Sequence, residues 1–288
     1  VAFLMDRIMN MGGVSGKSFM PMIIGFGCSV PALIAAKNIE DERERNITAL
    51  LIPLMSCNAK LPVYMLFATI FFHEKEIIVL AFMYATGVLI AFIYSLIFKL
   101  LVKEADYEPY IDELPAYTMP DLKLLLVHTW EKGKGFLKKI GTIIFSMSII
   151  TWTLSNFSFK GMVNINESFL AFIGKSISPI FNPLGFGNWQ NSVSLLTGLM
   201  GKEVIAGTLG VLYGGNLSTT IVQHFNTMSS LSFLLFILLY TPCASTIITL
   251  KKEFGTKMAL TSVFYQFATA WIVSFLFYNI GMRYFYGF

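Results

Sequence analysis

The chain has little charge and few cysteines, and each shortage excludes a class of protein. Only 13% of its 288 residues are charged and 55% are hydrophobic, whereas a soluble domain averages about 25% charged residues. The sequence therefore predicts an all-α polytopic membrane protein. Three cysteines, an odd number in apolar surroundings, argue against a disulfide framework. The net charge of +4 is spread over loops without a basic cluster, so we expect no nucleic-acid partner.

Familiar signatures of processing and catalysis are also missing. Nothing at the start resembles a cleavable signal, and because the first residue is Val1 we expect a fragment or a trimmed chain. The stretch Gly12–Ser18 resembles a phosphate-binding loop, but the first glycine of that motif would fall on Met11. The three histidines are far apart and form no triad or zinc spacing: His73, His128 and His224. We therefore predict no nucleotide site, no bound cofactor and no enzymatic activity.

Apolar stretches approach the length of about 20 residues that a membrane span requires. They are residues 18–36, 47–72, 77–101, 140–157, 190–212, 229–250 and 256–280. The stretches 77–101 and 256–280 contain no proline, which predicts uninterrupted helices. Prolines predict discontinuous helices in 18–36, 47–72 and 229–250, because proline removes a donor and clashes with the preceding turn. The glycines of 190–212 indicate instead a close approach of helices.

A faint internal repeat divides the chain. A shift of 174 positions places Gly27 on Gly201, and a shift of 186 places Cys57 on Cys243. We predict that residues 1–102 form a first repeat of Gate type, which is N-terminally incomplete. Residues 103–139 are predicted to form a polar loop and an amphipathic helix that lies in the membrane interface. Residues 140–288 are predicted to form a connecting helix and the second Gate repeat. Paired interrupted segments in the two halves of a chain are the best sequence pointer to a transporter binding site.

Each cysteine lies in a segment broken by proline or glycine: Cys28, Cys57 and Cys243. A helix break at membrane depth frees backbone groups, which is tolerated only where they are buried in protein or line a cavity. Thiolate is a good ligand for iron(II), zinc or copper(I) and a poor one for magnesium and calcium. The pattern predicts a path for a soft metal ion. The alternative is that the three cysteines are small apolar fillers in tight helix packing.

Three charged residues stand within apolar stretches, where each costs roughly 2.5–3.5 kcal/mol. Glu203 is a candidate for a cation site, whereas Lys60 and Lys202 are predicted to compensate carboxylates or free carbonyls, because a lysine on the path would repel a cation. Secondary path candidates stand beside the breaks: Met55, Met200, Ser29 and Asn58. Methionine more often fills gaps in a core.

These motifs, taken in order, resemble a known family. Two of the runs that carry the resemblance are in the first half of the chain: 16–32, with Gly25-Phe26-Gly27-Cys28-Ser29-Val30-Pro31, and 42–64, with Met55-Ser56-Cys57-Asn58-Ala59-Lys60-Leu61-Pro62. Two more are in the second half: 188–213, with Gly201-Lys202-Glu203-Val204, and Tyr240-Thr241-Pro242-Cys243-Ala244-Ser245-Thr246. Over nearly its whole length the chain is similar to the C-terminal membrane portion, with its two Gate regions, of ferrous iron transport protein B (FeoB).

The resemblance implies an Fe2+ importer of a bacterial or archaeal inner membrane, with Cys28, Cys57 and Cys243 as path residues and Fe2+ as the transported substrate. The family also carries an N-terminal GTP-binding domain with a helical spacer, and a first membrane segment ahead of Val1, none of which is in these 288 residues. Implied partners are the lipid bilayer, a GTP-binding domain in cis or in trans, small cytosolic Feo accessory proteins and further copies of the chain.

Two other functions remain open at this point. A nucleoside-type permease would share Gate regions, but it would favour asparagine, glutamine and glutamate at the breaks rather than cysteine. A membrane scaffold would dock a soluble GTPase through residues 103–139 without conducting an ion.

Overall fold

The computed structural model describes residues 14–101, 121–158, 161–163, 167–214 and 217–286, together with Asp6 and Met9. The predicted polar loop 103–120 lies outside the described residues. Within them, the strands are limited to a short antiparallel pair, β1 (Phe157–Ser158) and β2 (Gly161–Met162). The prediction of an all-α protein is confirmed.

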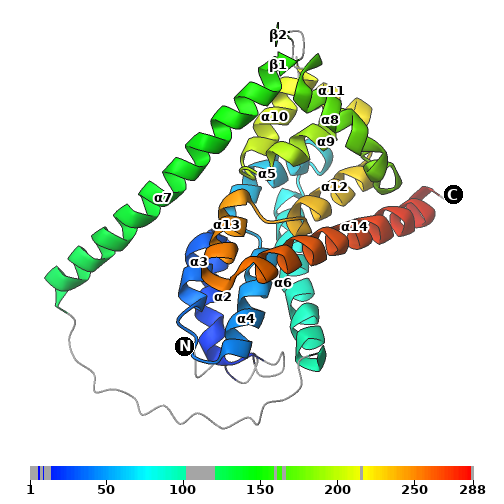
Figure 1. The fold of residues 1–288 in the computed structure, drawn as a ribbon. Helices are drawn as coiled ribbons and strands as arrows, with labels where there is room; N and C mark the ends of the chain where they lie inside the picture. The colour runs from blue at the N-terminus through cyan, green and yellow to red at the C-terminus, as the bar shows by residue number, and fades with distance from the viewer. Residues whose placement is uncertain are drawn as a thin grey trace.

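The first half of the chain is a series of short helices followed by one long helix (Figure 1). Its elements are η1 (Gly16–Ser18), α2 (Phe19–Gly27), α3 (Ser29–Ala36), α4 (Glu42–Leu51), η2 (Ile52–Leu54), η3 (Asn58–Lys60), α5 (Leu61–Phe71) and α6 (Glu76–Leu101).

The second half begins with a long helix and then repeats the pattern of short helices followed by a long one. Its helices are α7 (Leu122–Asn156), α8 (Phe169–Ile177), η5 (Ser178–Leu184), α9 (Trp189–Thr197), α10 (Val204–Tyr213), α11 (Leu217–His224), α12 (Thr227–Leu239), α13 (Ala244–Phe254) and α14 (Thr256–Tyr286).

Four helical stretches in the described part of the chain are long and apolar enough to cross a membrane: Glu42–Phe71, Glu76–Leu100, Thr227–Phe254 and Thr256–Tyr284. They correspond to four of the seven predicted spans and confirm a polytopic membrane protein. The stretches 18–36 and 190–212 fold as pairs of short helices instead, and 140–157 is the end of α7. The predicted breaks in 18–36, 47–72 and 229–250 and the uninterrupted helices over 77–101 and 256–280 are confirmed.

The stretch 190–212, whose glycines predicted a close approach of helices, is interrupted as well. Helix α9 ends at Thr197 and α10 begins at Val204. The Thr197 carbonyl accepts the amides of Met200 and Gly201 in a tight turn. Gly198 fits there because a Cβ at this position would lie 2.3 Å from Tyr240 Oη. The glycine therefore permits a close approach, as expected, but at a break rather than within a continuous helix.

Helix α7 joins two segments that the sequence suggested were separate. One helix runs from Leu122 to Asn156 and crosses the predicted boundary at residue 139 without interruption. Asp121 caps its start by accepting the Lys123 amide at 2.9 Å. Figure 1 shows α7 diverging from the other helices toward its N-terminal end, and Trp130 in that part is 72% exposed.

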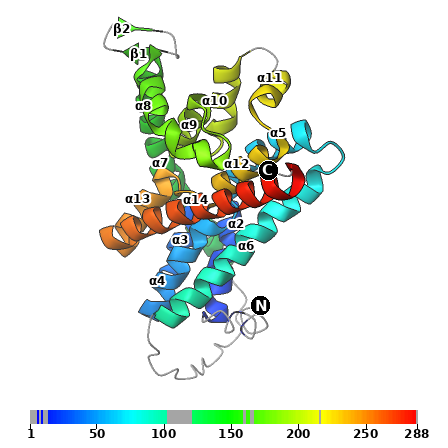
Figure 2. The ribbon, with the colours of Figure 1, turned by 90° about the vertical axis from the view of Figure 1, so that its right-hand side faces the viewer.

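Helix α12 forms the centre of the molecule. It lies in the apolar span Thr227–Phe254, whose most apolar 18-residue window is 78% buried. The corresponding windows in the spans of α6 and α14 are only 28% buried. The ring of Phe233 in α12 makes tilted or edge-on contacts with the rings of Phe67, Phe186 and Phe225, at centroid distances of 5.1–5.4 Å. Figure 2 shows α14 crossing the bundle beside α6. Helices α6 and α14 therefore supply much of the lipid-facing surface, and α12 holds the short helices together.

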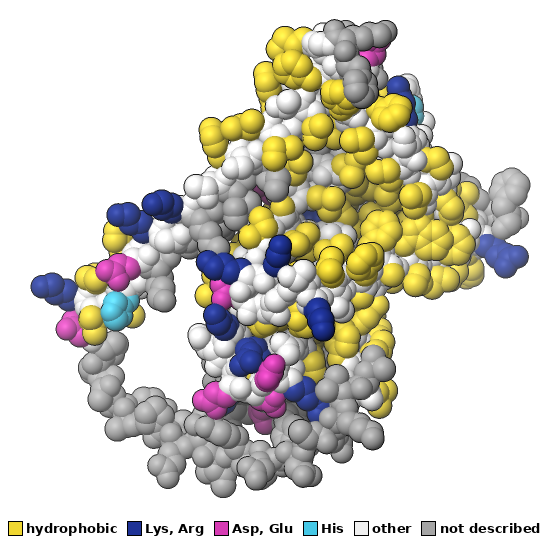
Figure 3. All heavy atoms as spheres, viewed as in Figure 1, with side chains coloured by type: hydrophobic (Ala, Val, Ile, Leu, Met, Phe, Trp, Pro, Cys, Tyr) yellow, Lys and Arg dark blue, Asp and Glu magenta, His cyan; other side chains and the backbone are white. Residues whose placement is uncertain are grey.

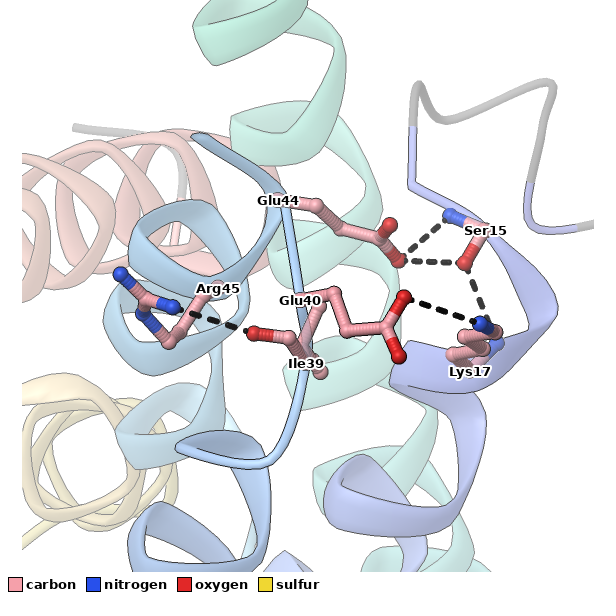
Figure 4. A network of polar contacts seen from close by, with 6 residues as sticks. All are labelled: Ser15, Lys17, Ile39, Glu40, Glu44 and Arg45. Atoms are coloured by element: carbon pink, nitrogen blue, oxygen red, sulfur yellow. Dashed lines mark hydrogen bonds and ion pairs between the residues drawn. The ribbon is translucent and has the colours of Figure 1, made fainter. Parts of the chain in front are cut away.

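Charged side chains gather at one end of the molecule, around the starts of α2 and α4, on the face that Figure 3 shows. There the Ser15 amide and hydroxyl both donate to Glu44 Oε1, at 2.8 and 2.7 Å (Figure 4). Nearby, Lys37 Nζ lies 2.7 Å from Glu253 Oε2 of α13. These contacts tie the segment before α2 to α4, and α3 to the second repeat, at a polar end.

Candidate functional site

All three cysteines occupy the same structural position. Cys28, Cys57 and Cys243 each have extended backbone (φ −155°, −76° and −63°; ψ 132°, 156° and 157°), and each directly precedes the first residue of a helix. The thiols are free and partly exposed. The breaks therefore present the sulfur atoms at the N-terminal ends of α3, η3 and α13.

The fold brings these breaks together from distant parts of the sequence. The Cys28 thiol lies near enough to Cys57, Cys243 and Glu203 to interact with each of them electrostatically. Glu203 is exposed, and its carboxylate lies over Gly201, 2.8 Å from the position a Cβ would take there. The other three principal predicted site residues, from both halves of the chain, thus lie within electrostatic range of Cys28.

Lys60 is buried in this region, with 3% of its surface exposed. Its Nζ donates to the Leu238 carbonyl at 2.7 Å and to the Met55 carbonyl at 3.4 Å. Met55 lies in the break after η2, and Leu238 is in the last turn of α12, where carbonyls have no partner within the helix. The expectation that Lys60 compensates free carbonyls is confirmed, and its contact joins the first repeat to the second.

Lys202, in the second half of the chain, has a similar role. It is 3% exposed, and its Nζ donates to the Thr241 carbonyl at 2.8 Å. The same Nζ lies 3.1 Å from the ring centroid of Tyr240, a cation–π geometry. Lys60 and Lys202 are both within electrostatic range of Cys57 and Cys243. The two amino groups therefore lie in the region of the thiols, but their hydrogen bonds go to backbone carbonyls.

Backbone contacts fix the two breaks of the second repeat against each other. The Ala244 amide donates to the Leu199 carbonyl at 2.6 Å, and Tyr240 Oη donates to the Leu195 carbonyl at 3.2 Å. Cys243 Sγ lies 3.1 Å from Thr246 Oγ1, one turn into α13. The Cys243 sulfur is thereby held at a defined place relative to the turn that carries Glu203.

The secondary candidates have different surroundings. Met55 is buried, and a Cβ on Gly25 would lie 3.5 Å from it, so its side chain fills the space beside α2. Met200 is partly buried, Ser29 is buried and Asn58 is exposed. Burial of Met55 against Gly25 is the packing role that methionine usually has.

The thiols do not form a closed metal centre. Within the residues that the structure describes, no group of three or more histidine, cysteine, aspartate or glutamate side chains is close enough together to hold a metal ion. The candidate ligands share a region but are spaced along it.

Two tyrosines beside the site were not predicted. Tyr64 is fully buried and accepts the Ser56 hydroxyl at 3.2 Å, and Tyr84 of α6 is within electrostatic range of Cys57. Tyr64 stands in the same apolar stretch as Cys57, so its hydroxyl group inside a predicted span was the sequence feature that could have identified it. Tyr84 comes from a different helix, and no local pattern links it to the break.

Comparison with known proteins shows the family of this chain. The profile of the Gate family, described as "Nucleoside recognition", matches residues 1–71 and 137–257, and that of "Ferrous iron transport protein B C terminus" matches residues 80–132. The chain belongs to the ferrous iron transport protein B family. It corresponds to the C-terminal membrane portion, so the resemblance read from the sequence is confirmed.

Relatives in this family come from bacteria and archaea. The chain is 44% identical to the Fe(2+) transporter FeoB of Staphylococcus aureus over 98% of its own length and 43% of that protein. It is 40% identical to the Methanocaldococcus jannaschii FeoB, over 98% of the chain and 44% of that protein. A Porphyromonas gingivalis protein named as a fusion of Fe(2+) transport protein A with FeoB is 36% identical, over 99% of the chain and 40% of that protein. The chain thus spans less than half the length of these relatives. No solved structure matches it.

Proposed function

We propose that this chain forms the permease part of an Fe2+ importer and moves the ion along a path lined by Cys28, Cys57 and Cys243. The observation that carries the proposal is that Cys28, at one helix break, lies within electrostatic range of Cys57 and Cys243 at two other breaks and of Glu203. The names of the relatives supply the cargo, because those in S. aureus and M. jannaschii are Fe(2+) transporters.

The spacing of the ligands suits conduction. A path must bind an ion well enough to replace its water but weakly enough to release it, which successive partial sites achieve better than one closed cage. Sulfur is a ligand for Fe2+, and Glu203 adds a negative charge within electrostatic range of Cys28. Met200, Ser29 and Asn58 are further contacts along this path, whereas Met55 has a packing role.

The setting follows from the family. We place the chain in a bacterial or archaeal inner membrane, working with a GTP-binding domain in cis or in trans and with small accessory proteins. The Porphyromonas gingivalis relative, named as a fusion with transport protein A, supports an accessory partner. Catalysis is assigned to that GTP-binding domain and not to these 288 residues, which carry Fe2+ as substrate rather than as a cofactor.

The alternatives are less well supported. The Gate profile carries the description "Nucleoside recognition", but the breaks present thiols, and the relatives reported above are named as iron transporters. A scaffold that docks a GTPase without conducting would not require cysteines from both repeats to meet inside the molecule.

Substitution of the cysteines tests the proposal. In the full-length protein, Cys28→Ser and Cys57→Ser should each lower Fe2+ uptake about 10-fold or more, because loss of a well-placed group at a metal site has effects of that size. Membrane insertion should not change, since serine is nearly isosteric.

Met65→Leu is the matched control, because it removes a sulfur that is 45% exposed on α5. Its uptake should equal that of the wild type. Undiminished uptake by the Cys28→Ser, Cys57→Ser double variant would remove sulfur from the mechanism.

A further inference from the structure

Backbone carbonyls freed by the helix breaks lie close to the thiols, and lysines hold three of them. Lys60 Nζ bonds to the carbonyls of Met55 and Leu238, and Lys202 Nζ bonds to that of Thr241. Both amino groups are within electrostatic range of Cys57 and Cys243. The carbonyl oxygens at these breaks are thus in the same region as the thiols, but they already have donors.

Such carbonyls are chemically suited to hard cations. Unwound backbone and the C-terminal ends of half-helices bind Na+ in other transporters, and carbonyl rings select among alkali ions in channels. Calcium likewise takes backbone oxygen ligands. An open set of carbonyls at a broken helix would therefore compete with thiols for abundant hard ions.

We propose that Lys60 and Lys202 determine the specificity of the site, by occupying the break carbonyls that would otherwise bind Na+, K+ or Ca2+. Their amino groups act as tethered substitutes for a hard cation, and the ligands left to a passing ion are mainly the sulfurs. This inference rests on the proposed transport of Fe2+. It adds a reason why a path through broken helices excludes Na+ and Ca2+, which backbone carbonyls can bind. Both halves of the chain contribute to this arrangement, because Lys60 comes from the first half and Lys202 from the second.

Ion-dependent stability tests the occupancy of the carbonyls without any transport. Purified full-length Lys60→Ala and Lys202→Ala are unfolded thermally in choline chloride, NaCl, KCl and CaCl2 at equal ionic strength. A vacated carbonyl site that binds one of these ions should raise the melting temperature of the variant by about 3 °C or more over choline. The wild type and Lys251→Ala, which loses an exposed lysine of α13, should show no such difference. Equal melting temperatures of the variants in all four salts would overturn the proposal.

Selectivity of the wild type gives a second measurement, which does not depend on the folding of any variant. In proteoliposomes the wild type should pass Fe2+ while Na+ and Ca2+ influx stays at the level of protein-free vesicles, and either lysine variant that inserts should raise Na+ or Ca2+ influx about 10-fold. A wild type that admits Ca2+ as fast as Fe2+ would contradict the proposal. If Fe2+ fails to enter while the variants still show ion-dependent melting, the iron function fails and the occupancy of the carbonyls stands.

Discussion

At the residue scale, two buried lysines of the site donate to backbone carbonyls at helix breaks: Lys60 to Leu238 and Lys202 to Thr241. Lys60 and Lys202 were expected to compensate free carbonyls because charges are costly in apolar stretches, and both do so. Which carbonyls they reach was not predictable. Leu238 lies 178 positions from Lys60, and no local pattern encodes such a pair.

Gly198 gives a residue-scale prediction about the fourth break. A Cβ there would lie 2.3 Å from Tyr240 Oη and 2.5 Å from Ile205 Cγ1, so Gly198→Ala should destabilise the protein by about 1–3 kcal/mol through overpacking. Gly207, in α10, has no atom within 4 Å of such a Cβ. Gly207→Ala should be neutral or should gain up to about 1 kcal/mol of helix stability. Thermal unfolding in detergent checks the pair, and equal loss from both variants would contradict the packing described here.

At the element scale, proline predicted breaks reliably and glycine did not. The breaks at Cys28, Met55–Cys57 and Tyr240–Cys243 all lie within four residues of a proline, which ends or kinks a helix for a local steric reason. Glycine is ambiguous, since it permits both close packing and a turn. A break occurs at Gly198, where the glycines predicted only close packing. Helix α7 continues through Gly133, Gly135 and Gly141 without a break.

The central place of α12 leads to a prediction at the scale of elements. Phe233 is fully buried among the rings of other helices, so Phe233→Ala should cost about 3–5 kcal/mol. Phe264, on the outer surface of α14, is 70% exposed, and Phe264→Ala should change stability by less than about 0.5 kcal/mol. Denaturant or thermal unfolding of the two variants tests this central position. If α12 were peripheral, the two substitutions would lower stability equally.

At the scale of the whole molecule, the repeat was visible in the sequence, but the packing of the two halves against each other was not. The shifts of 174 and 186 positions aligned the broken segments of the two halves. Only the fold shows that these segments face one another, with Lys60 of the first half bonded to α12 of the second and Cys28 near Cys243. Long-range packing of this kind depends on many side chains together, so the site as a shared region became apparent only from the structure.

The central claim is that sulfur atoms from both halves are ligands of the transported ion. X-ray absorption at the iron edge, on Fe2+-loaded protein under anaerobic conditions, measures this directly. The account predicts a sulfur shell at about 2.3 Å, the length of a metal–thiolate bond in zinc sites, which disappears in the Cys28→Ser, Cys57→Ser, Cys243→Ser variant. A shell of oxygen and nitrogen alone in the wild type, unchanged by the triple substitution, would contradict it.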